Sequence, residues 1–135
     1  MTEMGTTPPS PSTAVSGPVA LRIPAEPALS RIARLAASGL ASLTGFTIDD
    51  IEDIKIAVSE VTIALVEHGA GQPVELEFDA RDAFVVRART AVEEFDPEHP
   101  DLELCRTVLG EVCKEHGMSH VDGHAEIWAS VVRTG

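Results

Sequence analysis

Residues 47–68, TIDDIEDIKIAVSEVTIALVEH, decide how this chain folds, because they carry a strong helical pattern with a marked start. Their aliphatic residues recur at steps of three and four, which places them on one stripe of an α-helix that faces a core. Thr47 precedes the pattern and Asp50 follows three residues later, which is typical of a capping box at a helix N-terminus. The residues expected to be buried along this stripe are Ile48, Ile51, Ile54, Val58, Val61 and Leu65.

The segments before this helix predict a tail, a strand and a first helix. Residues 1–17 are rich in Pro, Ser, Thr and Gly and are expected to form a disordered tail, which leaves residues 18–135 as a single domain. Residues 18–24 alternate as a short strand, and a helix is expected from Pro27 to near Gly45. Its inward stripe is predicted to be Leu29, Ile32, Leu35, Ala36, Leu40 and Leu43. Its other face is small and favours close packing on another helix or a partner chain: Ala36, Ala37, Ser38 and Gly39.

The segments after the central helix predict two hairpins separated by a third helix. Residues 74–79 and 84–90 alternate apolar with polar positions, as expected of an antiparallel hairpin with one covered face. A helix is predicted over residues 102–115, followed by a hairpin over residues 118–133 that turns at Asp122-Gly123. The inward residues of that helix are predicted to be Leu104, Val108, Leu109 and Val112. The fold class is therefore α+β, a two-layer α/β sandwich with helices on one face of a mostly antiparallel sheet.

The composition excludes several classes of function. The 135 residues have a formal net charge of −12, which argues against direct binding of nucleic acid because phosphate contacts need Lys and Arg. An apolar run of the roughly 20 residues that span a bilayer is missing, and so is a signal peptide, so we expect a cytoplasmic protein with no membrane contact. Cys105 and Cys113 are eight residues apart, too far for a disulfide on one helix, and are interpreted as structural thiols.

A second face of the central helix, which includes Glu60 and Ala64, bears on function. The run Gly45–Glu60, GFTIDDIEDIKIAVSE, resembles the long helix of the anti-sigma factors that double as serine kinases in bacterial partner switching, members of the GHKL ATPase superfamily. With the order of elements from Val19 to Arg133, the resemblance implies a Bergerat-type fold. It gives Glu60 the position of the general base and Ala64 the position of a magnesium-binding Asn. A methyl group cannot ligate a hard cation.

The resemblance also implies where a nucleotide would lie. It places Thr90 at the Asp that binds the adenine amino group, and Val92 at the first glycine of the next turn. His99 and Asp101 fall on glycines whose amides cradle phosphates, although Asp101 would repel a phosphate by its charge. The hydroxyl of Thr90 keeps a hydrogen-bonding group but carries no charge. We therefore expect no cofactor, with ATP and magnesium bound only if this altered site still works.

The function implied by the resemblance is that of an anti-sigma factor. Such a protein sequesters a sigma factor, is countered by an anti-anti-sigma protein of the STAS class, and forms a homodimer. The family uses its first strand and first helix for these contacts, which points to Arg31, Arg34 and Ser38 as partner-binding residues. One alternative is an active ATP-dependent serine kinase that phosphorylates the STAS protein with Glu60 as base. Another is a dimerising scaffold that binds no sigma factor.

Simpler interpretations apply to several of these residues. Glu60 is also a typical solvated acid of an amphipathic helix, and Ala64 a typical core alanine. Three histidines with four-residue spacing suggest a metal site, but two glycines interrupt the helix that would align them, so no metal is expected. These histidines are His116, His120 and His124, and the glycines are Gly117 and Gly123.

Overall fold

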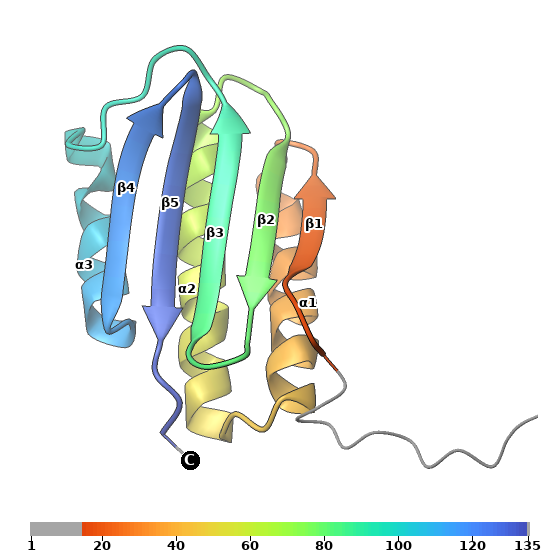
Figure 1. The fold of residues 1–135 in the computed structure, drawn as a ribbon. Coiled ribbons are helices and arrows are strands. Elements are labelled where there is room, and N and C mark those ends of the chain that lie inside the picture. The colour runs from red at the N-terminus through yellow and green to blue at the C-terminus, as the bar shows by residue number, and fades with distance from the viewer. Residues whose placement is uncertain (1–14, 135) are drawn as a thin grey trace, which may run out of the picture.

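The computed structural model describes residues 15–134, which form a sheet with helices packed on one side (Figure 1). In chain order the elements are β1 (Val19–Ile23), α1 (Ser30–Leu43), α2 (Ile48–His68), β2 (Val74–Asp79), β3 (Phe84–Ala91), α3 (Glu103–Val112), β4 (Glu115–Val121) and β5 (His124–Val131). Short 3-10 turns, Pro27–Leu29 and Pro100–Leu102, lead into α1 and α3. The disordered tail predicted for residues 1–17 lies, up to residue 14, outside the described residues.

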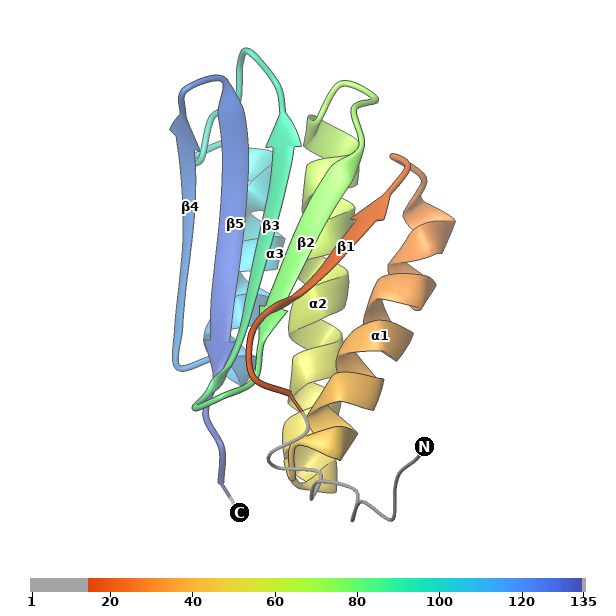
Figure 2. The same cartoon turned by 45° about the vertical axis from the view of Figure 1, so that its right-hand side comes forward.

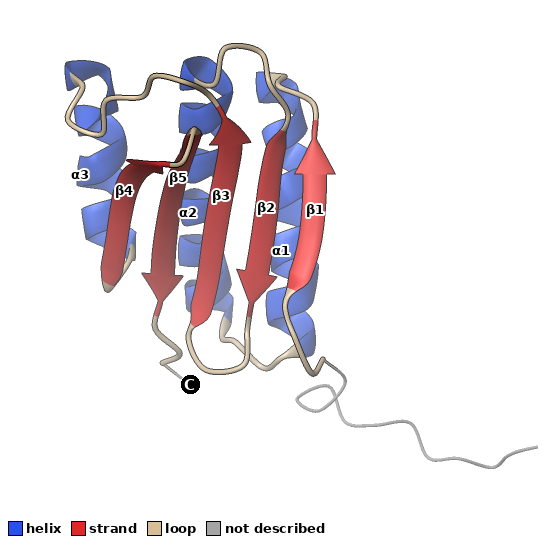
Figure 3. Cartoon of the chain, turned by 45° about the horizontal axis from the view of Figure 1, so that its top comes forward, coloured by secondary structure: helices blue, strands red, loops and turns tan. Residues whose placement is uncertain are grey.

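The strands lie in the order β1-β2-β3-β5-β4, and each neighbouring pair is antiparallel. Figures 2 and 3 show the strands in one layer and the helices in the other, which leaves the opposite face of the sheet open. The predicted two-layer α+β arrangement is confirmed. None of the helices within residues 15–134 is long and apolar enough to cross a membrane.

Helix α2 begins as its sequence predicts and supplies the centre of the core. The Asp50 amide donates to Thr47 Oγ1 at 3.1 Å, and the Thr47 amide donates back to the Asp50 carboxylate at 3.4 Å, so the capping box is confirmed. The middle and end of the predicted stripe are fully buried. Ile48 is instead 80% exposed, because it is the first residue of the helix and lies at the margin of the stripe. The fully buried stripe residues are Ile54, Val58, Val61 and Leu65.

Helix α1 packs mainly through its alanines and not through the whole of the predicted aliphatic stripe, of which Leu40 is buried as expected. Ala33, Ala37 and Ala41 are completely buried where α1 packs along α2. Small side chains let two helices approach closely, so the alanine face wins the contact over the larger aliphatic residues. The prediction of an inward aliphatic stripe is therefore wrong for three residues, which are half exposed or more: Ile32 at 49%, Leu35 at 66% and Leu43 at 51%.

The two predicted hairpins are present, and the face assignments of the first are confirmed. Val74, Leu76 and Phe78 of β2 are buried against the helices, while the acids between them are exposed. Asp122 and Gly123 make the turn of the second hairpin with φ of 54° and 74°, as a two-residue turn requires.

Helix α3 is shorter than predicted, and one of its residues faces the other way. It ends at Val112, and β4 already begins at Glu115. Leu104, predicted to face inward, is 72% exposed. Leu109 faces the core as predicted, and Cys105, one helical turn before it, faces the core in place of Leu104.

The last described residues, Arg133 and Thr134, connect the α1–α2 turn, the β2–β3 loop and the start of α2, which together form the lower end of the molecule in Figure 1. The Arg133 guanidinium lies 3.8 Å from the Phe46 ring centroid and donates to carbonyls of the α1–α2 turn and of the loop between β2 and β3. Thr134 donates its amide and hydroxyl to the buried carboxylate of Asp50. The end of the chain therefore completes the cap of α2.

Candidate functional site

Glu60, the position of the general base, lies half-buried on the outer side of α2. It lines a groove that also contains Arg34, Lys55 and Ser59. Burial, with a smaller contribution from the charge of Glu67, raises the pKa of the Glu60 carboxyl above its ordinary value. A carboxylate with a raised pKa is suited to accept a proton, although a nucleotide does not have to be involved for the shift to occur.

Ala64, one turn further along α2, is only 5% exposed. It belongs to the same buried apolar cluster as Leu102, Cys105 and Leu109, which come from α3 and the turn before it. The position that the resemblance assigns to a magnesium ligand is therefore part of the hydrophobic core. The residues of the groove beside Glu60 do not include Ala64.

Thr90, the position of the adenine-binding residue, is 2% exposed and already hydrogen-bonded within the protein. Its hydroxyl lies 2.9 Å from the carbonyl oxygen of Pro73, to which it donates. Its methyl group crowds Gly69, where an added Cβ would lie 2.9 Å from Thr90 Cγ2. This hydroxyl closes the loop between α2 and β2, so its one proton is committed to the backbone and not directed at a ligand.

The segment between β3 and α3 contains the remaining positions that the resemblance assigns to the nucleotide. His99 Nδ1 accepts the Asp101 amide at 3.0 Å, so His99 caps the turn that leads into α3. The imidazole of His99 also lies 5.6 Å from that of His68, between ring centroids, and the Phe95 ring lies 6.2 Å from the same imidazole. Sequence reasoning missed this aromatic cluster, since its members are separated by up to about thirty residues and no local pattern connects them.

The proposed partner-binding residues all lie on α1, but they differ in exposure. Arg31 is exposed, whereas Arg34 and Ser38 are half-buried. Arg34 donates to Ser59 Oγ at 3.2 Å and so links α1 to α2 beside Glu60. The structure therefore brings Arg34 and Glu60 into one groove.

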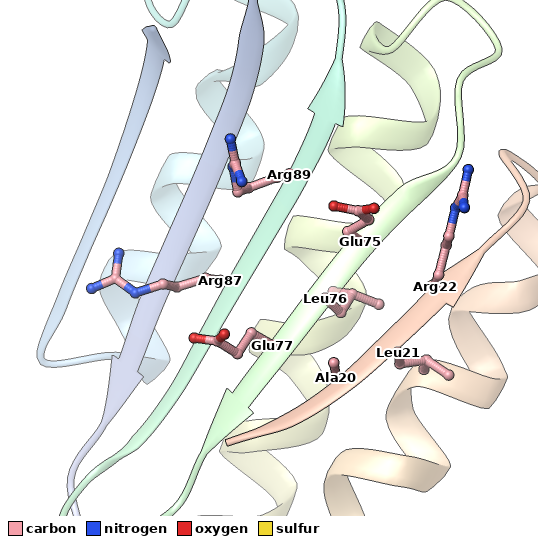
Figure 4. Close-up of a pocket in the computed structure, with 8 residues that line it drawn as sticks. All are labelled: Ala20, Leu21, Arg22, Glu75, Leu76, Glu77, Arg87 and Arg89. Atoms are coloured by element: carbon pink, nitrogen blue, oxygen red, sulfur yellow. The ribbon is translucent and has the colours of Figure 1, made fainter. Parts of the chain in front are cut away.

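A second groove crosses the open face of the sheet over β1, β2 and β3 (Figure 4). Its charged side chains are Arg22, Glu75, Glu77, Arg87 and Arg89, so arginines and glutamates alternate across the strands. Glu126 of β5 adds ion pairs with two of the arginines. Because these charges compensate one another, the groove has no strong preference for anions or cations.

The three histidines considered as metal ligands and the two cysteines lie in different parts of the fold. His116 and His120 lie on β4 and His124 on β5, so the helix that would align them is absent. No three His, Cys, Asp or Glu side chains within residues 15–134 are placed to hold a metal ion. Both cysteines are free, and burial raises the pKa of the Cys105 thiol to about 12 and that of Cys113 to about 11.

Comparison with known proteins identifies the family to which this chain belongs. The family model of the histidine kinase-like ATPase domain matches residues 23–119. The chain belongs to this family. The resemblance drawn from Gly45–Glu60 is thereby confirmed, and the match extends from the end of β1 into β4.

Two kinds of relative support this membership in the histidine kinase-like ATPase family. The serine-protein kinase RsbW of Bacillus velezensis is 38% identical over 91 residues, which are 62% of this chain and 57% of that protein. RsbW of Bacillus subtilis is 48% identical over 50 residues, 37% of this chain and 31% of that protein. The crystal structure of the RsbU and RsbW domains of Rv1364c from Mycobacterium tuberculosis superposes with a TM-score of 0.66 at 18% identity, covering 88% of this chain and 33% of that one.

The alignments with the RsbW proteins are partial, and the solved structure is distant in sequence. The alignments span little more than half of the Bacillus velezensis protein and less of the Bacillus subtilis one. The solved structure, at 18% identity, shows a shared fold. Together the comparisons establish the family and the fold of this chain.

Proposed function

We propose that this chain is a cytoplasmic anti-sigma regulatory factor that binds and sequesters a sigma factor in a partner-switching pathway, without acting as a kinase. Its relatives named serine-protein kinase RsbW support the pathway. The observation that carries the loss of kinase activity is Ala64, whose buried methyl group stands where the family places its magnesium ligand. The hydrogen bond from Thr90 to Pro73 supports the loss of adenine binding, because it uses the hydroxyl proton at the position of the adenine-binding residue.

The outer face of α1 is the proposed partner surface. Ile32, Leu35 and Leu43 are exposed there, beside the cation of Arg31. Exposed aliphatic residues flanked by arginine are typical of the centre of a protein interface. We propose that the sigma factor and a second copy of this chain use this face, with Arg31, Arg34 and Ser38 among the contacts, and that a STAS-class antagonist displaces the sigma factor.

Co-expression with candidate sigma factors tests the proposal. The tagged chain is expected to retain one sigma factor in a pull-down, and Leu35→Glu is expected to abolish that complex because it places a charge in the centre of the contact. Leu104→Glu is the matched control, since Leu104 is a leucine of similar exposure on α3, 72% against 66% for Leu35. The proposal fails if no sigma factor is retained, or if the two variants weaken the complex equally. A dimer that binds no sigma factor would support the scaffold alternative.

One observation favours the alternative of an active serine kinase. Glu60 retains the position of the base, is half-buried rather than sealed in the core, and has a raised pKa. A kinase would need another oxygen ligand for magnesium in place of Ala64. Titration calorimetry with Mg-ATP separates the two functions. Micromolar binding, together with phosphate transfer to a STAS protein that Glu60→Gln abolishes, would establish the kinase, and silence at millimolar nucleotide would exclude it.

A further inference from the structure

The open face of the sheet carries its charges in columns, with one sign on each strand. The columns are positive on β1, negative on β2, positive on β3 and negative on β5, in the order in which these strands lie side by side. The positions between them in each strand are buried against the helices, so the charged side chains point to the open side (Figure 4). In strand order the charged residues are Arg22, Glu75 and Glu77, Arg87 and Arg89, and Glu126.

Such columns are complementary to a copy of themselves. A two-fold axis that runs along the strands, in front of the boundary between β2 and β3, sets β2 against β3 of a second copy and β1 against its β5. Every column then faces a column of the opposite sign. Two sheets that pack in this aligned way keep their strand directions within about 30° of each other, so residues at one level of the sheet stay close to one level across the contact.

The register of the strands gives the pairs at the first charged level. Arg22, Glu75, Arg89 and Glu126 are cross-strand neighbours in a single row. Across the two-fold axis, Arg22 faces Glu126 of the second copy, and Glu75 faces its Arg89. Each of these charges also has an opposite charge beside it in its own chain, so none becomes isolated when the two faces close.

The next level along the strands adds an apolar contact. Ala20, Glu77, Arg87 and Trp128 form this row. Glu77 faces Arg87 of the second copy, and the half-buried ring of Trp128 faces its Ala20. Ala20 is exposed and lines a hollow of about 440 Å³ over β1, β2 and β3, which a ring from the second copy can enter. Tryptophan and arginine are enriched among the residues that dominate binding at protein interfaces.

We propose that the open face of the sheet is a contact between two copies of this chain, with Trp128 of each copy seated over Ala20 of the other and the charged columns paired around it. The proposal rests on the proposed function and deepens it. That function gives the outer face of α1 to a sigma factor and to a second copy, which would compete for the same residues. A copy on the open face leaves α1 to the sigma factor.

Sedimentation of the full chain over a range of concentrations tests the contact. The wild type is expected to be a dimer, and the emission of its single Trp is expected to shift to the red on dilution, as Trp128 becomes more exposed. Arg87→Glu and Glu77→Arg each set like charges opposite one another at two symmetric points. Each variant alone is therefore expected to raise the dissociation constant of the dimer at least about a hundredfold.

A mixture of these two variants tests the pairing itself. When one copy carries Arg87→Glu and the other carries Glu77→Arg, the two substituted positions face each other with opposite charges, and the unsubstituted Glu77 and Arg87 form the second pair. The mixture is expected to form a heterodimer, a result that a misfolded variant cannot give. Lys114→Glu is the matched control, since it makes the same reversal of charge at an exposed residue outside the open face, and is expected to leave the dissociation constant unchanged.

Three results would overturn the proposal. They are a wild type that stays monomeric up to about 1 mM, a mixture of the two variants that does not associate, and a dimer that Leu35→Glu disrupts but Arg87→Glu does not. None of them bears on the capture of a sigma factor, because Arg87→Glu is expected to retain the sigma factor as the wild type does. A pull-down that retains no sigma factor would leave the dimer standing.

Discussion

Replacing Arg133 by alanine removes the side chain that joins three parts of the lower end of the molecule. The guanidinium donates to the carbonyl oxygens of Thr44 at 2.6 Å, Ala80 at 3.0 Å and Asp82 at 3.2 Å, and it stacks on the Phe46 ring. In the variant, these carbonyls lose a charged donor. They belong to the α1–α2 turn and to the loop between β2 and β3, so the two layers of the fold lose a shared anchor.

The size of the effect follows from these contacts. A hydrogen bond to a charged group contributes about 1.5 to 3 kcal/mol where both partners are buried, and a cation–π contact about 0.5 to 2 kcal/mol. Arg133 is only half-buried, so water replaces part of each contact. We therefore expect Arg133→Ala to lower the free energy of unfolding by about 3 kcal/mol, which is a large fraction of the stability of a typical domain.

Urea denaturation followed by the fluorescence of the single Trp, with circular dichroism as a second probe, measures this loss. Arg133→Lys keeps the charge but not the fork of donors, and is expected to recover a minor part of the stability. Arg81→Ala, which removes an exposed ion pair with Asp79, is the control and is expected to change little. A free energy of unfolding for Arg133→Ala within about 0.5 kcal/mol of the wild type would refute the reasoning.

Three further predictions follow from buried or crowded groups. Burial raises the pKa of the Asp50 carboxyl, but its hydrogen bonds outweigh burial and lower the pKa, so its contribution to stability is complete above about pH 4 and is lost as the pH falls through the folded-state pKa. In urea titrations from neutral to acid pH, the free energy of unfolding of Asp50→Asn is expected to fall less steeply with pH than that of the wild type. Equal slopes for the two proteins would contradict this. Burial raises the pKa of the Cys105 thiol to about 12 and that of Cys113 to about 11, which leaves little of the reactive thiolate at neutral pH. Both are expected to react with a disulfide reagent at least about a hundredfold more slowly in the native chain than in urea. Equal rates in the two conditions would show that the thiols are accessible. Gly117→Ala would place a Cβ 2.6 Å from the Trp128 indole nitrogen, so the ring is expected to move into solvent. The fluorescence emission of Trp128 is then expected to shift to the red, and the free energy of unfolding to fall by about 1 kcal/mol. An unchanged emission spectrum would count against the contact.

The parts of the fold that sequence reasoning predicted correctly depend on local signals. The capping box of α2, the alternation of β2 and the Asp122-Gly123 turn each involve residues a few positions apart, and the structure contains all three. The inward stripe predicted for α1 is wrong at Ile32 and Leu35, which hydrophobicity alone favours, and right at Leu40. Which face packs depends on how closely α2 approaches, and that distance is a property of the assembled fold.

The candidate site shows the same division. The resemblance carried by the run Gly45–Glu60 was enough to mark Glu60 and Ala64, because it rests on one continuous stretch of sequence. The bond from Thr90 to Pro73 and the contact of Arg106 with Pro97 could not be predicted, since each joins elements that meet only after the chain has folded. These tertiary contacts decide whether a position with the right residue type is free to bind a ligand.

The alanine seam between α1 and α2 separates two tasks that many proteins combine in one set of residues. Folding depends on Ala33, Ala37 and Ala41, where a larger side chain would force the helices apart, while the outward positions of the same helix are spared that constraint. Mutations on the outer face can therefore accumulate at little cost to the domain's own integrity. Such a helix is free to diverge between gene duplicates, so that copies of one scaffold acquire different binding preferences without having to be rebuilt from within.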